Sequence, residues 1–197
     1  MLNPHPFADR WNHNSHYYPR VAAAIPADAR LVLDVGCGDG TLVRSLRRSA
    51  RRVVGVELDP SVLPTDPDGV DYLMASAEAL PFAPASVDAL TMIMVLHHIE
   101  SARALTEVRR VLRPGGTFAL LGYGFDASPY DWIRSGFDVV LHRTYAVTTR
   151  PGEPTVRLAD PNMSWSQNRR MLESELPGGR YRRLPLWRFE YLWTAPR

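Results

Sequence analysis

Short apolar runs alternate with amphipathic stretches along the first 120 residues of the chain. The runs are short enough to be buried strands, and the stretches between them place apolar residues three and four positions apart, as helices do. The predicted strands are Arg30–Val35, Arg52–Val56, Val70–Met74, Ser86–Val95 and Thr117–Leu121, with helices at Thr41–Ser49 and Ser101–Leu112 and a turn at Arg113–Gly116. This alternation is typical of a parallel sheet with helices on both of its faces.

The pattern changes after Asp126. Pro129–Tyr145 has its apolar residues, among them Trp132, Ile133, Phe137, Val140 and Leu141, at helical spacing. A loop at Thr148–Asn162 and a short helix at Asn168–Leu176 follow, and two strands, Arg180–Leu184 and Leu186–Thr194, meet at Pro185. Because no repeat or linker interrupts the chain, we expect residues 1–197 to form one domain.

Composition narrows the function classes. The chain has 23 arginines, no lysine, 21 acids and a net charge of +2, and 45% of its residues are hydrophobic. The absence of lysine excludes Schiff-base chemistry, and so small a net charge gives little support for a nucleic-acid partner. The apolar run at Ala89–Leu96 is too short to span a membrane, and Met1–Pro6 lacks a signal pattern. With Cys37 as the single cysteine, we expect a cytoplasmic protein with no membrane partner.

A glycine-rich turn follows the first predicted strand, in the sequence Asp34-Val35-Gly36-Cys37-Gly38-Asp39-Gly40. Alternate glycines let the backbone turn tightly and approach a ligand closely. The spacing departs from the dinucleotide-binding pattern, and Asp34 would repel a pyrophosphate but suit a cationic group such as an ammonium. Glu57, at the end of the second strand, could accept both hydroxyls of a ribose.

Taken in order, the segments VLDVGCGDG, VGVELDP, AEALPF, VDALTMIMVLHHI and VRRVLRPGGTFALLG resemble the motifs of class I S-adenosylmethionine-dependent methyltransferases. The resemblance covers about residues 30–122 and is nearest to the small-molecule branch of the family. It implies a Rossmann-like α/β fold, with a mostly parallel seven-stranded sheet whose last strand is antiparallel.

The same resemblance implies the residues that bind the cofactor S-adenosylmethionine. Asp34 and the loop residues would hold its methionine end, Glu57 its ribose, and Leu58 and the residues after the third strand its adenine. The family often has Asp where Ser76 stands, so a looser adenine site or a replacement contact is expected. The full set is Asp34, Gly36, Cys37, Gly38, Gly40, Glu57, Leu58, Ser76, Ala77, and the backbone of Ile93 and Met94.

The N-terminal segment, residues 1–29, is interpreted as a lid over the cofactor because its polar aromatic residues come just before the first strand. His13, Asn14 and Tyr17 are the residues expected to touch the cofactor or acceptor. A docked surface helix is the alternative. His13 and His16 have neither a cysteine nor a pair of carboxylates to complete a metal site, so no metal is expected.

Candidate catalytic residues are His97 and His98, which follow the fourth strand at the edge where ligands of such sheets bind. His98 could be a general base with Glu100 nearby, although packing against the next helix explains both histidines at least as well. In the segment 126–176 and just before it, Tyr123, Phe125, Trp132 and His142 are the expected acceptor-side residues. The aromatic residues there suit an apolar pocket or a dimer surface.

The predicted activity is methyl transfer to the oxygen or nitrogen of a small molecule, by a monomer or homodimer. An RNA or protein methyltransferase is one alternative, although the fourth strand is not followed by the Asn/Asp-Pro-Pro-aromatic tetrapeptide. A protein that binds the cofactor without transferring its methyl group is the other.

Overall fold

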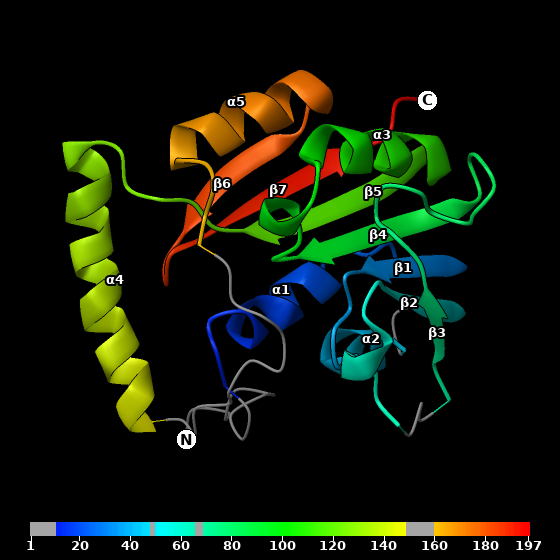
Figure 1. Cartoon of the computed structure of the whole chain (residues 1–197), viewed down its shortest axis with the longest axis horizontal. Coiled ribbons are helices and arrows are strands. Elements are labelled where there is room, and N and C mark those ends of the chain that lie inside the picture. Colours follow the sequence, from blue (N-terminus) through cyan, green and yellow to red (C-terminus); the bar gives the residue numbers. More distant parts are fainter. Residues whose placement is uncertain (1–10, 48–49, 66–68, 149–159) are drawn as a thin grey trace.

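The computed structural model describes residues 11–47, 50–65, 69–148 and 160–197. Seven strands form one sheet in the order β3-β2-β1-β4-β5-β7-β6 (Figure 1). The strands are β1 (Leu31–Val35), β2 (Arg52–Glu57), β3 (Asp71–Met74), β4 (Val87–Ile93), β5 (Leu112–Gly122), β6 (Arg180–Leu184) and β7 (Arg188–Thr194). β1 to β5 pair in parallel, and β7 is antiparallel to both of its neighbours. The predicted fold class, including the antiparallel last strand, is confirmed.

Helices cover both faces of the sheet. α1 (Tyr18–Ala22) and α2 (Thr41–Leu46) pack on one face, and α3 (Ser101–Val111) and α5 (Trp165–Glu175) pack on the other (Figure 1). Successive β1 residues alternate between these layers: Val32 packs with α1 and α2, and Leu33 packs with α3. Both are fully buried, which explains why the strand begins with three consecutive apolar residues, Leu31, Val32 and Leu33. In the described part of the chain, no helix is both long and apolar enough to cross a membrane.

The predicted turn at Arg113–Gly116 is part of a strand. α3 ends at Val111, and β5 begins at Leu112, which pairs with Val87 before the register shifts so that Thr117 pairs with Ala89. The four residues between form an irregularity in which Gly115 has a φ of 77°. The Gly115 N–H donates to the Ala195 carbonyl at 2.9 Å, so the glycines bend the strand without ending it.

Helix α5 begins at Trp165, three residues before the predicted start at Asn168. The Ser164 hydroxyl accepts the N–H of Gln167, and the Gln167 side chain accepts the N–H of Ser164, which is a capping box. Helix α4 (Pro129–Thr148) also extends beyond its predicted end at Tyr145. Short 3-10 turns lie at η2 (Ser15–Tyr17), η3 (Pro60–Val62) and η4 (Leu96–His98). Most of the predicted loop Thr148–Asn162 lies outside the described residues.

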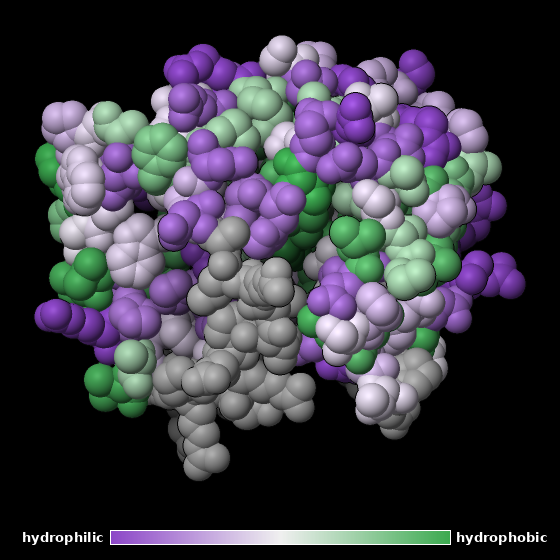
Figure 2. All heavy atoms as spheres, viewed as in Figure 1, coloured by the Kyte–Doolittle hydropathy of each residue, from purple (hydrophilic) through white to green (hydrophobic). Residues whose placement is uncertain are grey.

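Helix α4 is inverted relative to an ordinary amphipathic helix. Its polar residues Asp131 and Asp138 are 9% and 4% exposed, and they face the rest of the protein. Its large apolar residues face outward, with Tyr130, Trp132, Ile133, Phe137 and Val140 all between 63% and 71% exposed. Figure 2 shows green, hydrophobic residues along the edge of the molecule where Figure 1 places α4.

Polar contacts hold α4 in place. Asp131 forms an ion pair with Arg183 of β6. The two carboxylate oxygens of Asp138 accept the backbone N–H groups of Leu186 and Trp187 at 2.9 and 3.1 Å. Asp131 thus neutralises Arg183, and Asp138 supplies the acceptors for the backbone N–H groups of the turn between β6 and β7. These two roles explain why both acids face inward.

Candidate active site

The glycine-rich loop leaves the carboxyl end of β1 in a conformation that needs glycine. Gly36, Gly38 and Gly40 have φ values of 71°, 51° and 72°. A Cβ atom on Gly36 would lie 2.3 Å from a Val95 methyl group, so the loop also approaches the segment after β4 too closely for a side chain. The Gly36 and Cys37 N–H groups donate to the Val56 carbonyl at 2.7 and 3.1 Å, which fixes the loop against β2.

Asp34 is a buried acid directly beneath this loop. It is 2% exposed, and its Oδ1 accepts a hydrogen bond of 2.7 Å from the Thr91 hydroxyl on β4. The pKa of the Asp34 carboxyl is raised to about 7: burial is the main cause, the hydrogen bond from Thr91 opposes it, and the nearby Glu57 carboxylate adds a smaller increase. Among the described residues, no arginine pairs with Asp34. A ligand cation would supply the missing charge.

Glu57 joins the end of β2 to the glycine loop. Its Oε2 accepts the Gly38 N–H at 3.0 Å, and its Oε1 accepts the N–H groups of Leu58 and Asp59 at 2.8 and 3.1 Å. Beside it, Leu58 and Met74 are 64% and 63% exposed at the ends of neighbouring strands. The carboxylate is thus held at the sheet edge next to two exposed apolar side chains, a pairing suited to a nucleoside.

Ser76 and Cys37 have local structural roles. The Ser76 hydroxyl accepts the N–H of Glu78 at 3.1 Å, and Ala77 is buried in the core beneath it. Cys37 is 8% exposed, and a Cβ atom on Gly55 would lie 2.8 Å from its sulfur. Burial and nearby carboxylates raise the pKa of the Cys37 thiol, so this thiol is a packing group under the loop.

The segment after β4 brings the backbone of Ile93 and Met94 to the same edge. Met94 has a φ of 58°, in the left-handed region that a residue with a side chain rarely adopts, and its N–H donates to the Leu121 carbonyl at 2.8 Å. Strained conformations of this kind often occur at functional sites.

His97 and His98 have different environments. The His97 ring lies edge-on to Tyr123 with 4.6 Å between ring centres. Burial, His98 and Arg188 lower the pKa of His97 to about 4, so its imidazole is neutral at pH 7. His98 is exposed. The predicted partnership of His98 with Glu100 is not formed, because Glu100 caps α3 through the Ala102 N–H and pairs with Arg103.

The N-terminal residues contact the C-terminal part of the chain. His13 and His142 lie 2.9 Å apart through their ring nitrogens, and the Tyr17 hydroxyl donates to the Pro185 carbonyl at 2.8 Å. Asn14 accepts a hydrogen bond of 2.9 Å from Arg188. The predicted residues His13, Asn14, Tyr17 and His142 therefore gather between the N-terminal segment, α4 and the start of β7.

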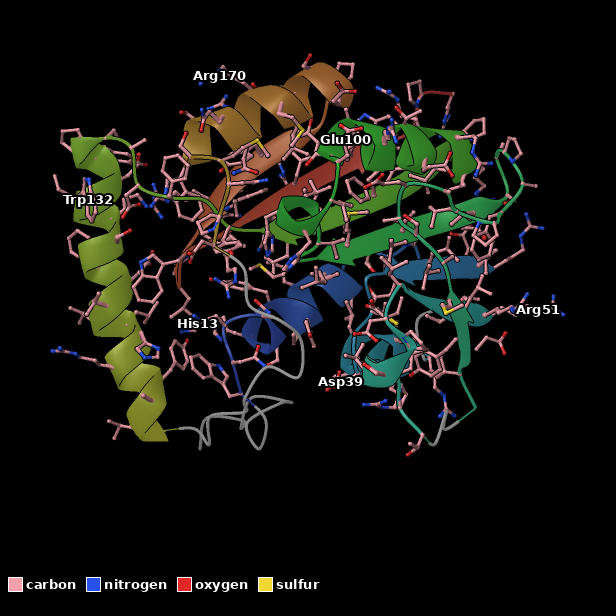
Figure 3. The ribbon with its side chains drawn as sticks, viewed as in Figure 1. His13, Asp39, Arg51, Glu100, Trp132 and Arg170 are labelled. Carbon is pink, nitrogen blue, oxygen red and sulfur yellow. The ribbon has the colours of Figure 1, made fainter. Side chains whose placement is uncertain are left out.

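Two predicted acceptor-side residues do not join this group. Trp132 is 66% exposed on the outward face of α4, and Figure 3 shows it far from His13. Phe125 is 41% exposed and pairs through its backbone with Ser164. The expectation for Trp132 is corrected, because the inverted orientation of α4 places it on the outside.

Arg188 and Tyr18 are site residues that the sequence analysis missed. Tyr18 packs against the core cluster that contains Cys37 of the glycine loop, and burial, with the carboxylates of Asp34 and Asp39, raises the pKa of its phenol. Arg188 begins β7, and its guanidinium lies 5.8 Å from the ring centre of Tyr123. The detectable signal was an arginine at the start of a mostly apolar strand in which the only other charged residue is Glu190.

These residues fit S-adenosylmethionine. The buried Asp34 carboxylate has no cationic partner in the part of the chain that the structure describes, and the cofactor's methionine end carries an ammonium. The glycine loop leaves room that a Cβ atom would fill, and Glu57 with Leu58 and Met74 suits a ribose and an adenine.

Comparison with known proteins agrees with this geometry. Residues 33–120 match the family described as a methyltransferase domain. An uncharacterized methyltransferase of Mycobacterium tuberculosis is 35% identical over 119 residues, an alignment that covers 57% of this chain and 60% of the relative. A second one, also from M. tuberculosis, is 35% identical over 119 residues, with 59% of this chain and 49% of the relative covered. The chain therefore spans about half to three fifths of the curated relatives that it matches.

Solved structures share the fold. A S-adenosylmethionine-dependent methyltransferase from Methanosarcina mazei superposes with a TM-score of 0.63 at 18% identity, covering 91% of this chain and 98% of that one. The complex of the Haloferax volcanii Trm112 methyltransferase activator with a methyltransferase gives a TM-score of 0.63 at 18% identity, with 92% and 90% covered. Together with the matched motifs, these findings show that residues 33–120 match the methyltransferase-domain family, and that the chain shares its fold with S-adenosylmethionine-dependent methyltransferases.

Proposed function

We propose that this chain transfers a methyl group from S-adenosylmethionine to the oxygen or nitrogen of a small-molecule acceptor. The observation that carries the proposal is the buried Asp34 carboxylate, which lies beneath the glycine loop without a cationic partner among the described residues. Glu57 holds the other side of the same loop through the Gly38 N–H. The two acids thus suit the two ends of the cofactor.

When bound, the cofactor supplies a methyl group on a sulfonium, which is already a good leaving group. The remaining work of the protein is to align the acceptor and to exclude water. In the proposed site, His97 and Tyr123 form the acceptor side, next to the cofactor platform. A neutral His97 can accept a hydrogen bond from an acceptor hydroxyl or amine, although its low pKa makes it a weak base.

The N-terminal segment is proposed to cover the cofactor. The Tyr17–Pro185 and Asn14–Arg188 hydrogen bonds hold it against the start of β7. Both bonds join residues far apart in the sequence, so the cover depends on the C-terminal strands. The described residues 11–29 would then be the lid, and residues 126–148 and 160–176 the acceptor side, of one domain; residues 1–10 and 149–159 of the predicted segments lie outside the described residues.

The test begins with calorimetric titration of S-adenosylhomocysteine into the wild type and into Asp34→Asn and Glu57→Ala variants. Asp71→Asn is the matched control, because Asp71 is an exposed acid of β3 that pairs with Arg52 of β2. We expect binding to the wild type and control, and binding weakened at least tenfold in the two site variants. No binding to the wild type would overturn the proposal.

The second step separates acceptor classes. Tritium transfer from methyl-labelled S-adenosylmethionine is followed into small-molecule, RNA and protein fractions of a bacterial extract. Label in the small-molecule fraction supports the proposal. Label in RNA or protein would instead support an RNA or protein methyltransferase. The fold shared with a methyltransferase solved in complex with an activator protein is a reason to test these acceptors. Binding without any transfer would favour a cofactor-binding protein.

A further inference from the structure

Arg188 carries a charge that no described carboxylate neutralises. It is half-buried at the start of β7, and its hydrogen bonds go to neutral oxygens. Nε donates to Asn14 at 2.9 Å, and Nη1 donates to the carbonyls of Trp187 and Leu186 at 3.0 and 3.4 Å. The other terminal nitrogen, Nη2, donates to no residue in the described part of the chain.

The neighbouring carboxylates are committed elsewhere. Asp138 acts on Arg188 at a distance, but both of its oxygens accept N–H groups of the β6–β7 turn. Glu190, on the same face of β7, forms a two-point ion pair with Arg20 at 2.7 Å. Burial lowers the pKa of the Arg188 guanidinium to about 10, so it remains charged at pH 7.

Arg183 shows what a structural arginine looks like in this sheet. It lies on the neighbouring strand β6 and pairs with two carboxylates, Asp126 and Asp131. A partly buried charge is costly unless it is paired, and Arg183 follows this rule within the chain. The difference between the two arginines indicates that the partner of Arg188 is a bound ligand and not one of the described residues.

The position of Arg188 points to the acceptor. Because β7 runs antiparallel to β5, its first residue lies at the carboxyl edge of the parallel strands, one position beyond the Gly122–Phe189 pair. The guanidinium lies over the Tyr123 ring, and the same ring makes an edge-on contact with His97. The charge therefore stands beside the aromatic side chains on the acceptor side of the proposed site.

We infer that Arg188 binds the carboxylate of a methyl acceptor, which is therefore an organic acid with a planar or aromatic body. This inference rests on the proposed methyl transfer. A single unpaired cation matches the single negative charge of a carboxylate, and the guanidinium geometry favours planar oxyanions. The rings of Tyr123 and His97 provide flat surfaces against which an unsaturated body can pack.

The experiment uses the full chain saturated with S-adenosylhomocysteine and a panel of small acids. Benzoate, 4-hydroxybenzoate and cinnamate are compared with their primary amides by saturation-transfer NMR and calorimetry. We expect at least one acid to bind the wild type and its amide to bind at least tenfold more weakly. Arg188→Met should weaken that acid about tenfold to a hundredfold, and Arg188→Lys should restore part of the loss.

Arg180→Met, at an exposed position of β6, is the matched control and should bind the acid like the wild type. Thermal unfolding reports whether Arg188→Met folds. If it does not, the comparison of acid with amide in the wild type still tests the inference. Equal binding of acids and amides, or no binding of any acid, would overturn it.

Two further outcomes distinguish related explanations. If Arg188→Met weakens S-adenosylhomocysteine more than tenfold but leaves 5′-methylthioadenosine unchanged, the guanidinium holds the cofactor's own carboxylate, and the inference is wrong. If the wild type binds no S-adenosylhomocysteine, the proposed function fails first. An intact cofactor affinity with lost acid binding supports the inference.

Discussion

Asp34 accepts a hydrogen bond of 2.7 Å from the hydroxyl of Thr91, its partner across the parallel pair of β1 and β4. Both residues are at most 2% exposed. A neutral hydroxyl orients the carboxylate without neutralising it, so the acid stays available for a cation. The bond thus positions an ionised carboxylate whose burial is unfavourable until a cationic ligand binds beside it.

The first prediction is that Asp34→Asn stabilises the ligand-free protein while it removes cofactor binding. Because the folded-state pKa of about 7 lies above the ordinary value of 3.8, folding is penalised once the unfolded acid ionises. The penalty is absent well below pH 4 and complete above pH 7. Urea unfolding at pH 8 should show a gain of about 2–4 kcal/mol for the variant, shrinking towards pH 4. An equal effect at both pH values would contradict this account.

The second prediction concerns the affinity of the wild type for S-adenosylhomocysteine as a function of pH. An ammonium beside Asp34 favours the ionised carboxylate, so binding releases a proton below pH 7. The affinity should fall about tenfold per pH unit below the pKa of about 7 and stay constant above pH 8. Calorimetry in buffers of different ionisation enthalpy measures the released proton. The Asp34→Asn variant should lose this proton release.

The third prediction is that Glu57→Ala weakens S-adenosylhomocysteine binding about tenfold to a hundredfold. The change removes the acceptor for the N–H groups of Gly38, Leu58 and Asp59, together with the proposed ribose contact. Glu57→Gln, which keeps one accepting oxygen, should lose less. Glu173→Ala, on the surface of α5, is the control and should bind normally. Unchanged binding by Glu57→Ala would remove this residue from the site.

The fourth prediction tests the approach of the glycine loop to the segment after β4. Gly36→Ala should lose cofactor binding and destabilise the fold, because its φ of 71° alone costs a residue with a side chain about 1–2 kcal/mol. The added methyl group also meets Val95 at 2.3 Å. The double variant Gly36→Ala/Val95→Ala should regain the part of stability lost to the clash, but not the part lost to φ. Chemical unfolding of both variants and Val95→Ala gives the comparison.

The fifth prediction compares neighbours on α4. Asp138→Ala leaves two buried N–H groups without acceptors and should cost about 1–3 kcal/mol of unfolding free energy. Phe137→Ser changes a side chain that is 71% exposed and should alter stability by less than about 0.5 kcal/mol. A larger loss from Phe137→Ser than from Asp138→Ala would show that the apolar face of α4 is covered.

Apolar patterning predicts the strands of this sheet well, because strands buried on both faces appear as uninterrupted apolar runs. All seven predicted strands are present, with shifts at their ends. Boundaries that depend on side-chain capping were less predictable: α5 begins early because Ser164 and Gln167 cap one another. The orientation of α4 could not be predicted, because its partners, Arg183 and the β6–β7 turn, lie about fifty residues away in the sequence.

The cofactor side of the candidate site was predictable because Asp34, the glycine loop and Glu57 follow directly from strand ends. The acceptor side was not. Its central charge, Arg188, comes from the last strand and meets Asn14 from the N-terminal segment. Contacts between the two ends of a chain leave no periodic pattern for sequence analysis to detect.

The inward acids of α4 also decide how this helix is rotated about its own axis. A half turn would direct Phe137 and Ile133 towards the rest of the protein and away from water, which the hydrophobic effect favours. It would also remove the Asp131 partner of Arg183 and leave the N–H groups of Leu186 and Trp187 without acceptors. Burial of the apolar side chains and hydrogen bonding by the acids therefore favour opposite orientations of α4. The hydrogen bonds determine the orientation that is found. The single orientation of α4 rests on a few directed hydrogen bonds, although it leaves the apolar side chains of the helix exposed.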